Sequence, residues 1–192
     1  MIGSRESGEC AVVDPLLDID TVVSESKNEG FDRITHVIDT HTHADHISGA
    51  RNVAKMFNLS GVHMHADSSR RFKTISVHDG QTLELGGMEL RFISTPGHTY
   101  DHVSILVDNS KVLTGDTILI GDVGRIDLGG DPCDNSDRLY DSLHCKLLKL
   151  DDSVEVFPTH VGATHYLGNA STSSTIGREK ANNPALKLKS KD

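Results

Sequence analysis

The chain has 192 residues, 36% of them hydrophobic, and a net charge of −9 at pH 7, so we expect a single domain over residues 1–192. The negative charge argues against a nucleic-acid partner, which needs clustered Lys and Arg. The absence of a long apolar run, a signal segment or a C-x-x-C pair predicts a cytoplasmic protein with no membrane partner.

The hydrophobic pattern predicts alternating strands and helices along the chain. The first half contains an expected strand 10–14, helix 18–28, strand 34–39, helix 48–57 and strand 61–65. The second half contains expected strands 83–85, 88–92, 103–107 and 111–113, a long helix 136–150, a strand 154–157 and a helix 175–183. This mixture predicts an α/β fold built from layers of sheet and helix.

The most informative stretch is Thr40-His41-Thr42-His43-Ala44-Asp45-His46, which follows an apolar run ending at Ile38. It sets three imidazoles and one carboxylate within six residues. Imidazole nitrogen and carboxylate oxygen suit zinc or non-haem iron. The stretch therefore predicts a metal site.

Three more candidate ligands each follow a strand-like run, in Thr-Pro-Gly-His98, Leu-Thr-Gly-Asp116 and Phe-Pro-Thr-His160. The end of a strand is a rigid position from which a loop residue can be aimed at a shared point. We therefore expect four strand ends to meet at one metal centre.

This order of motifs resembles the metallo-β-lactamase superfamily, whose signature is H-x-H-x-D-H, a later His, a later Asp and a last His. The matching metal ligands here are His41, His43, Asp45, His46, His98, Asp116 and His160. The resemblance implies the αβ/βα four-layer sandwich of that superfamily. Within it, residues 40–49, 115–128 and 173–186 are most similar to persulfide dioxygenases of the ethylmalonic encephalopathy protein type and to rhodanese-linked modules of the glyoxalase II-like branch.

The resemblance to persulfide dioxygenases implies one Fe(II) per chain, held by His41, His98 and Asp116. Such a site would oxidise a low-molecular-weight thiol persulfide to sulfite and thiol. Asp45 would then serve as a catalytic proton acceptor, and His43, His46 and His160 would support the ligands by hydrogen bonds. A separate rhodanese is an expected partner.

The resemblance to glyoxalase II implies instead a zinc hydrolase, with one or two Zn(II) per chain, that cleaves a thioester such as hydroxyacylglutathione. One zinc would take His41, His43 and His98, the other would take Asp45, His46 and His160, and Asp116 would bridge them. Only 32 residues follow His160, too few for the helical C-terminal region of true glyoxalase II. This favours the dioxygenase. A metal-binding module without turnover is a third alternative.

Substrate contacts are expected from Arg125, His165 and Tyr166, and His102 is a further candidate for lining the pocket. Arg125 could instead be a buried residue that fixes its loop by pairing with Asp127. Family members usually begin with one or two strands before the segment Met1–Ser4, so this chain is expected to start late. A sheet edge left uncovered would favour a homodimer.

Overall fold

The computed structural model describes residues 1–69, 72–160 and 171–188. The first half comprises β1 (Ile2–Ser4), β2 (Glu9–Val13), α1 (Ile19–Asn28), β3 (Arg33–Ile38), α2 (Ala50–Met56), β4 (Val62–His65) and β5 (Thr74–Val77). The second half comprises β6 (Thr82–Leu85), β7 (Met88–Ser94), β8 (Val103–Val107), β9 (Lys111–Gly115), β10 (Ile118–Leu119), β11 (Asp122–Val123), α3 (Pro132–Asp141), β12 (Glu155–Pro158), β13 (Ser174–Thr175) and α4 (Ile176–Asn182). Every helix among these residues is too short or too polar to cross a lipid bilayer.

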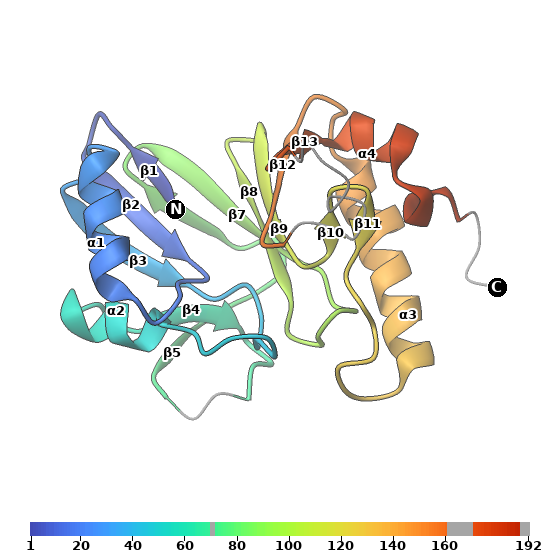
Figure 1. The fold of residues 1–192 in the computed structure, drawn as a ribbon, viewed down its shortest axis with the longest axis horizontal. Coiled ribbons are helices and arrows are strands. Elements are labelled where there is room, and N and C mark those ends of the chain that lie inside the picture. The colour runs from blue at the N-terminus through green and yellow to red at the C-terminus, as the bar shows by residue number, and fades with distance from the viewer. Residues whose placement is uncertain (70–71, 161–170, 189–192) are drawn as a thin grey trace.

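Two large sheets pack face to face, with helices on both outer sides (Figure 1), and β10 pairs with β11 in a separate two-stranded sheet. One sheet has the order β1-β2-β3-β4-β5 and is covered by α1 and α2. The other has the order β13-β12-β9-β8-β7-β6 and is covered by α3 and α4. The predicted αβ/βα four-layer sandwich is therefore confirmed.

Alternating side chains in the strands fill the three interfaces between these layers. In β2, Ala11 faces the opposite sheet, whereas Cys10 and Val12 pack towards α1 and α2. In β8, Ile105 faces the first sheet and Leu106 packs towards α3. The sandwich is thus held by one core between the sheets and one under each helical layer.

Local chemistry explains where these elements begin and end. Asp18 caps α1, because its carboxylate accepts the backbone N–H of Thr21 at 3.2 Å. Strands β2 and β3 are parallel across α1, as the predicted β-α-β unit requires. The hairpin between β8 and β9 turns through Asp108 and Asn109, both at positive φ, where these residue types are tolerated.

The chain is helical over most of the predicted range 136–150, but the segment begins earlier and is not one α-helix. The helix begins at Pro132 behind the N-cap Asp131, changes to a π-helical turn over Ser142–Lys146 and ends in a 3₁₀ turn over Leu147–Lys149. Leu139, Leu143 and Leu147 are buried and Leu150 is partly buried, so the leucine spacing could not distinguish these helix types. The sequence analysis also overlooked β5 and the edge strand β1, each only three or four residues long.

Candidate metal centre

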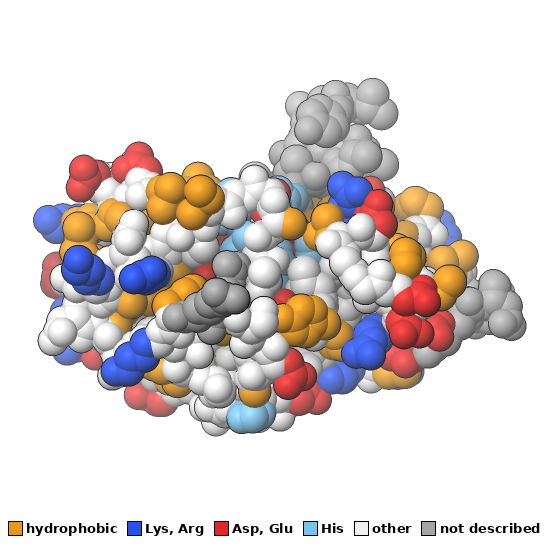
Figure 2. All heavy atoms as spheres, turned by 90° about the horizontal axis from the view of Figure 1, so that it is seen from below, with side chains coloured by type: hydrophobic (Ala, Val, Ile, Leu, Met, Phe, Trp, Pro, Cys, Tyr) orange, Lys and Arg blue, Asp and Glu red, His pale blue; other side chains and the backbone are white. Residues whose placement is uncertain are grey.

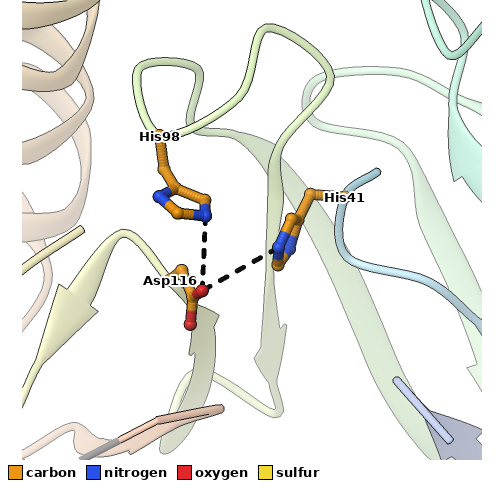
Figure 3. Close-up of side chains that lie close together, drawn as sticks. All are labelled: His41, His98 and Asp116. Carbon is orange, nitrogen blue, oxygen red and sulfur yellow. Dashed lines mark ion pairs between the residues drawn. The ribbon is translucent and has the colours of Figure 1, made fainter. Parts of the chain in front are cut away.

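Strands β3, β7 and β9, and β12 before His160, end at the boundary between the two halves of the molecule. The loop after β3 carries His41, and the loops after β7 and β9 carry His98 and Asp116. One donor atom from each of these three residues lies within 4.8 Å of the others. Asp116 Oδ2 is 3.3 Å from His98 Nε2 and 3.9 Å from His41 Nε2 (Figure 3). The predicted convergence of strand ends thus occurs.

The hydrogen bonds around His41 fix which of its nitrogens is protonated. The Thr40 hydroxyl donates its single hydrogen to Asp14 Oδ2 at 2.8 Å, so it must accept from His41 Nδ1 at 2.9 Å. His41 Nε2 therefore carries a lone pair, and it is buried without a hydrogen-bond partner among the described residues. Burial also lowers the pKa of His41, which keeps the ring neutral.

His98 is prepared in the same way from the other half of the molecule. Its Nδ1 donates to the backbone carbonyl of Arg125 at 3.0 Å, because a carbonyl can only accept. The lone pair of His98 is consequently on Nε2, the atom that faces Asp116. Two neutral imidazoles with an oriented lone pair and one carboxylate are what a divalent metal requires.

A second group of donor atoms consists of His43, Asp45 and His46. His43 Nε2 donates to Asp14 Oδ1 at 3.0 Å, and His46 Nδ1 contacts Asp45 Oδ2 at 3.1 Å. The remaining nitrogens, His43 Nδ1 and His46 Nε2, are buried and have no hydrogen-bond partner within the described chain. This group is therefore able to hold a metal as well.

His160 lies between the two groups and touches a carboxylate with each ring nitrogen. Its Nδ1 is 2.7 Å from Asp116 Oδ1, and its Nε2 is 3.0 Å from Asp45 Oδ2. Burial acts to lower the pKa of His160, but its hydrogen bonds and charge interactions with Asp116 and Asp45 raise it overall. Burial likewise opposes ionisation of Asp45, yet contacts with His46 and His160 lower its pKa to about 2.

Asp14 is a member of this site that the sequence analysis missed. It follows β2 directly, at a φ of 48°, and its carboxylate accepts the Thr40 backbone N–H at 2.7 Å and the Thr159 hydroxyl at 3.3 Å. Burial would raise the pKa of Asp14, but the hydrogen bonds from His43 and Thr40 lower it. The only signal in the sequence was a single aspartate at the end of an apolar strand.

His102 does not line a pocket and is instead fully buried behind His41. The two rings stack with their centroids 4.9 Å apart and an interplanar angle of 19°. His102 Nε2 accepts the Asp116 backbone N–H at 3.0 Å, and burial lowers the pKa of His102 to about 3. The neutral ring of His102 therefore contacts two candidate ligands, His41 by stacking and Asp116 by a hydrogen bond.

The predicted pair of Arg125 with Asp127 is present, but the prediction that a structural Arg125 is buried is wrong. Its guanidinium is exposed and pairs with both oxygens of Asp127, at 2.6 and 2.8 Å. The contact that reaches the site is its backbone carbonyl on His98. His165 and Tyr166, the other two predicted substrate contacts, lie outside the described residues.

A cavity of about 420 Å³ opens beside the first donor group, a size suited to a small molecule. It is lined by Ala44, Asp45, His98, Asp116, Leu119, Asp122, Val123, Gly124, Arg125, Leu128 and His160. Histidine side chains reach the surface between the two halves of the molecule (Figure 2). A metal ion bound by these donor atoms would therefore lie next to a small molecule in the cavity.

Comparison with known proteins agrees with this chemistry. Residues 2–160 match the family model described as the metallo-beta-lactamase superfamily. The chain is 32% identical to persulfide dioxygenase ETHE1 of Bos taurus, over 98% of this chain and 70% of that protein. It is 30% identical to the hydroxyacylglutathione hydrolase of Francisella tularensis subsp. novicida, over 85% and 62%. The solved structure of ETHE1 from Myxococcus xanthus superposes with a TM-score of 0.86, at 30% identity, over 99% and 79%.

Proposed function

The chain belongs to the metallo-beta-lactamase superfamily, and we propose that it acts there as a persulfide dioxygenase with one Fe(II) per chain. Its ligands would be His41, His98 and Asp116. The observation that carries the proposal is the convergence of these three donors, since two imidazoles and one carboxylate are the ligand set of non-haem Fe(II) oxygenases. Similarity to persulfide dioxygenase ETHE1 supports the same substrate class.

When bound, Fe(II) would supply the redox chemistry by which O₂ oxidises the outer sulfur of the persulfide. The net reaction turns R–S–SH, O₂ and water into R–SH and sulfurous acid, with the outer sulfur gaining three oxygens. The chain supplies orientation. The Arg125 carbonyl fixes the ring of His98, and His102 and His160 fix the backbone and the carboxylate of Asp116.

Asp45 and His160 are placed to move protons in this reaction. Asp45 lines the cavity and is ionised at neutral pH, because its pKa lies at about 2. Its carboxylate would accept the proton that a persulfide or a water loses, and His160 would share that proton through its 3.0 Å contact with Asp45. Proton acceptance thus takes place next to the metal ligands.

The cavity supports a small-molecule thiol persulfide as substrate. Arg125 lines it, so we propose that its guanidinium contacts an anionic group of the carrier thiol. Four points stay predictions. They are substrate contacts from His165 and Tyr166, a separate rhodanese partner, a homodimer, and a single domain over residues 1–192.

The second candidate is a dinuclear zinc hydrolase that cleaves a thioester. It is favoured by the buried, unpartnered nitrogens of His43 and His46 beside Asp45, which offer places for a second metal. It is also favoured by similarity to hydroxyacylglutathione hydrolase. However, His43 falls in a different donor group from His41 and His98, whereas the dinuclear arrangement requires all three on one ion.

The deciding experiment is oxygen uptake with glutathione persulfide, on protein reconstituted anaerobically with Fe(II), with metal content measured in the same sample. The dioxygenase predicts uptake, sulfite formation and about one iron per chain. Absence of uptake, together with two zinc ions per chain and cleavage of a glutathione thioester, would establish the hydrolase instead.

A further inference from the structure

We propose that Asp101 and Thr42 form a positioning pair that fixes the metal-binding loop against the segment Asp101–Val103. The inference rests on the metal centre described above and applies whichever reaction that centre carries out. It concerns how His41 and His43 are held relative to His98. No motif in the sequence pointed to Asp101.

The two segments lie antiparallel, residue against residue. The Val103 backbone N–H donates to the Thr40 carbonyl at 2.8 Å. The ring of His102 stacks on that of His41. Asp101 then accepts from Thr42 twice, from the backbone N–H at 3.2 Å and from the hydroxyl at 2.6 Å. The loop is thereby held at three successive positions.

Thr42 is the residue through which such a contact reaches two candidate ligands, because it lies between His41 and His43. Asp14 holds Thr40 in the same manner, through its N–H at 2.7 Å and its hydroxyl at 2.8 Å. The threonines on both sides of His41 are thus each held by one buried carboxylate. Asp14 follows β2 in the first half, whereas Asp101 comes from the loop that also carries His98. Asp101 therefore sets the two ligand loops relative to each other.

The burial of the Asp101 carboxyl group supports a role beyond packing. Asp101 is only 1% exposed. Among the described residues, no Lys or Arg forms an ion pair with its carboxyl group. An ionised carboxylate is costly to bury without a countercharge. A divalent cation bound by the neighbouring loop would supply that countercharge. Asp101 is accordingly expected to strengthen metal binding by charge as well as by geometry.

Four variants test the pair, with Co(II) as a spectroscopic probe whose affinity is measured by competition with a chelator. Asp101→Ala and Thr42→Val are expected to weaken Co(II) binding by about 10- to 100-fold, the usual cost of losing support for metal ligands, and to change the visible Co(II) spectrum. Thr42→Ser keeps the hydroxyl and should restore most of the affinity. Asp101→Asn keeps an acceptor without the charge and should be intermediate.

Asp151→Ala is the matched control, because Asp151 also accepts a backbone N–H and a hydroxyl, from Ser153 at 2.8 and 2.6 Å, outside the metal centre. Unchanged Co(II) affinity and spectrum in folded Asp101→Ala and Thr42→Val would overturn the proposal, as would a lower melting temperature without a change in affinity. If Asp101→Ala does not fold, the Thr42 pair decides. These measurements do not depend on enzymatic activity. If the wild-type protein fails to oxidise persulfide, only the proposed function is refuted, and the proposed positioning pair is not affected.

Discussion

The two halves of the molecule contribute to the metal centre in different ways. The first half supplies His41, His43, Asp45 and His46 from one short loop, and the Asp14 carboxylate anchors that loop. The second half supplies His98, Asp116 and His160 from three loops, anchored mainly through backbone groups. The group formed by His41, His98 and Asp116 draws on both halves. A compact motif is therefore only part of a site that packing between the sheets completes.

The largest effect is expected on removing a ligand that the second half contributes. Asp116→Ala should abolish iron binding and oxygen uptake, with a loss greater than the roughly 100-fold cost of removing a supporting residue. His160→Ala removes a residue that contacts Asp116 and Asp45 but stands outside the three-donor group. It should retain about one iron per chain with a reduced rate. The measurements are metal content by mass spectrometry and oxygen uptake on the same samples.

Full activity in Asp116→Ala would refute the ligand assignment. Loss of one of two bound metals in His160→Ala, with thioester cleavage abolished, would favour the dinuclear hydrolase. Both variants change only the second half. If Asp116→Ala no longer binds metal although the loop with His41, His43, Asp45 and His46 is unchanged, that loop alone is insufficient for metal binding.

A smaller effect is expected where the helical layer supports the His98 loop. Ser142, in the π-helical turn, donates its hydroxyl to the Pro96 carbonyl at 2.7 Å, and Gly97 packs directly against Leu139. Ser142→Ala removes this hydrogen bond from the part-buried Pro96 carbonyl and should lower the free energy of unfolding by about 0.5–1.5 kcal/mol. Iron affinity should fall with it, because His98 follows the loop. Urea unfolding and chelator competition measure the two effects.

Ser110→Ala is the control for this variant. Ser110 also donates a hydroxyl to a backbone carbonyl, that of Val107 at 3.3 Å, but in an exposed hairpin turn where water can replace it. Its effect on stability and on iron affinity should be near zero. Equal losses in the two variants would show that the π-helical turn gives the metal centre no particular support.

The contrast between the halves also explains how far the sequence predicts this protein. Continuous apolar runs identified β2, β3 and β8, because each strand is buried on both faces by sheet and helix. The short strands β1 and β5 carry too few residues to show a period. The leucines of the expected long helix reported burial but not the change from α to π geometry.

The candidate site follows the same logic. His41, His98 and Asp116 were predicted because each belongs to a motif next to a strand, and the structure brings them together. Asp14 and Asp101 carry no motif, and their importance arises from hydrogen bonds to residues 26 and 59 positions away. The Asp14 contact forms only when β2 pairs with β3, and the Asp101 contact forms only when the two halves pack together. Local sequence therefore indicates the donors but not the side chains that orient them.

A further effect, confined to stability at acid pH, is expected at His63, whose ring lies in the interface between the sheets and stacks on Phe92 with centroids 6.4 Å apart. Burial lowers the pKa of His63 to about 4. Between pH 6.5 and 4, His63 is therefore protonated in the unfolded chain but neutral in the folded protein. The free energy of unfolding consequently decreases as pH falls through this window. The loss amounts to roughly 3 kcal/mol at most. His63→Phe keeps a ring against Phe92 and should flatten the acid limb of the free energy of unfolding, measured by urea titration of both metal-free proteins. If the free energy of unfolding falls equally steeply with pH in the two proteins, His63 has the same pKa in the folded and unfolded chains. The acid sensitivity then comes from other groups.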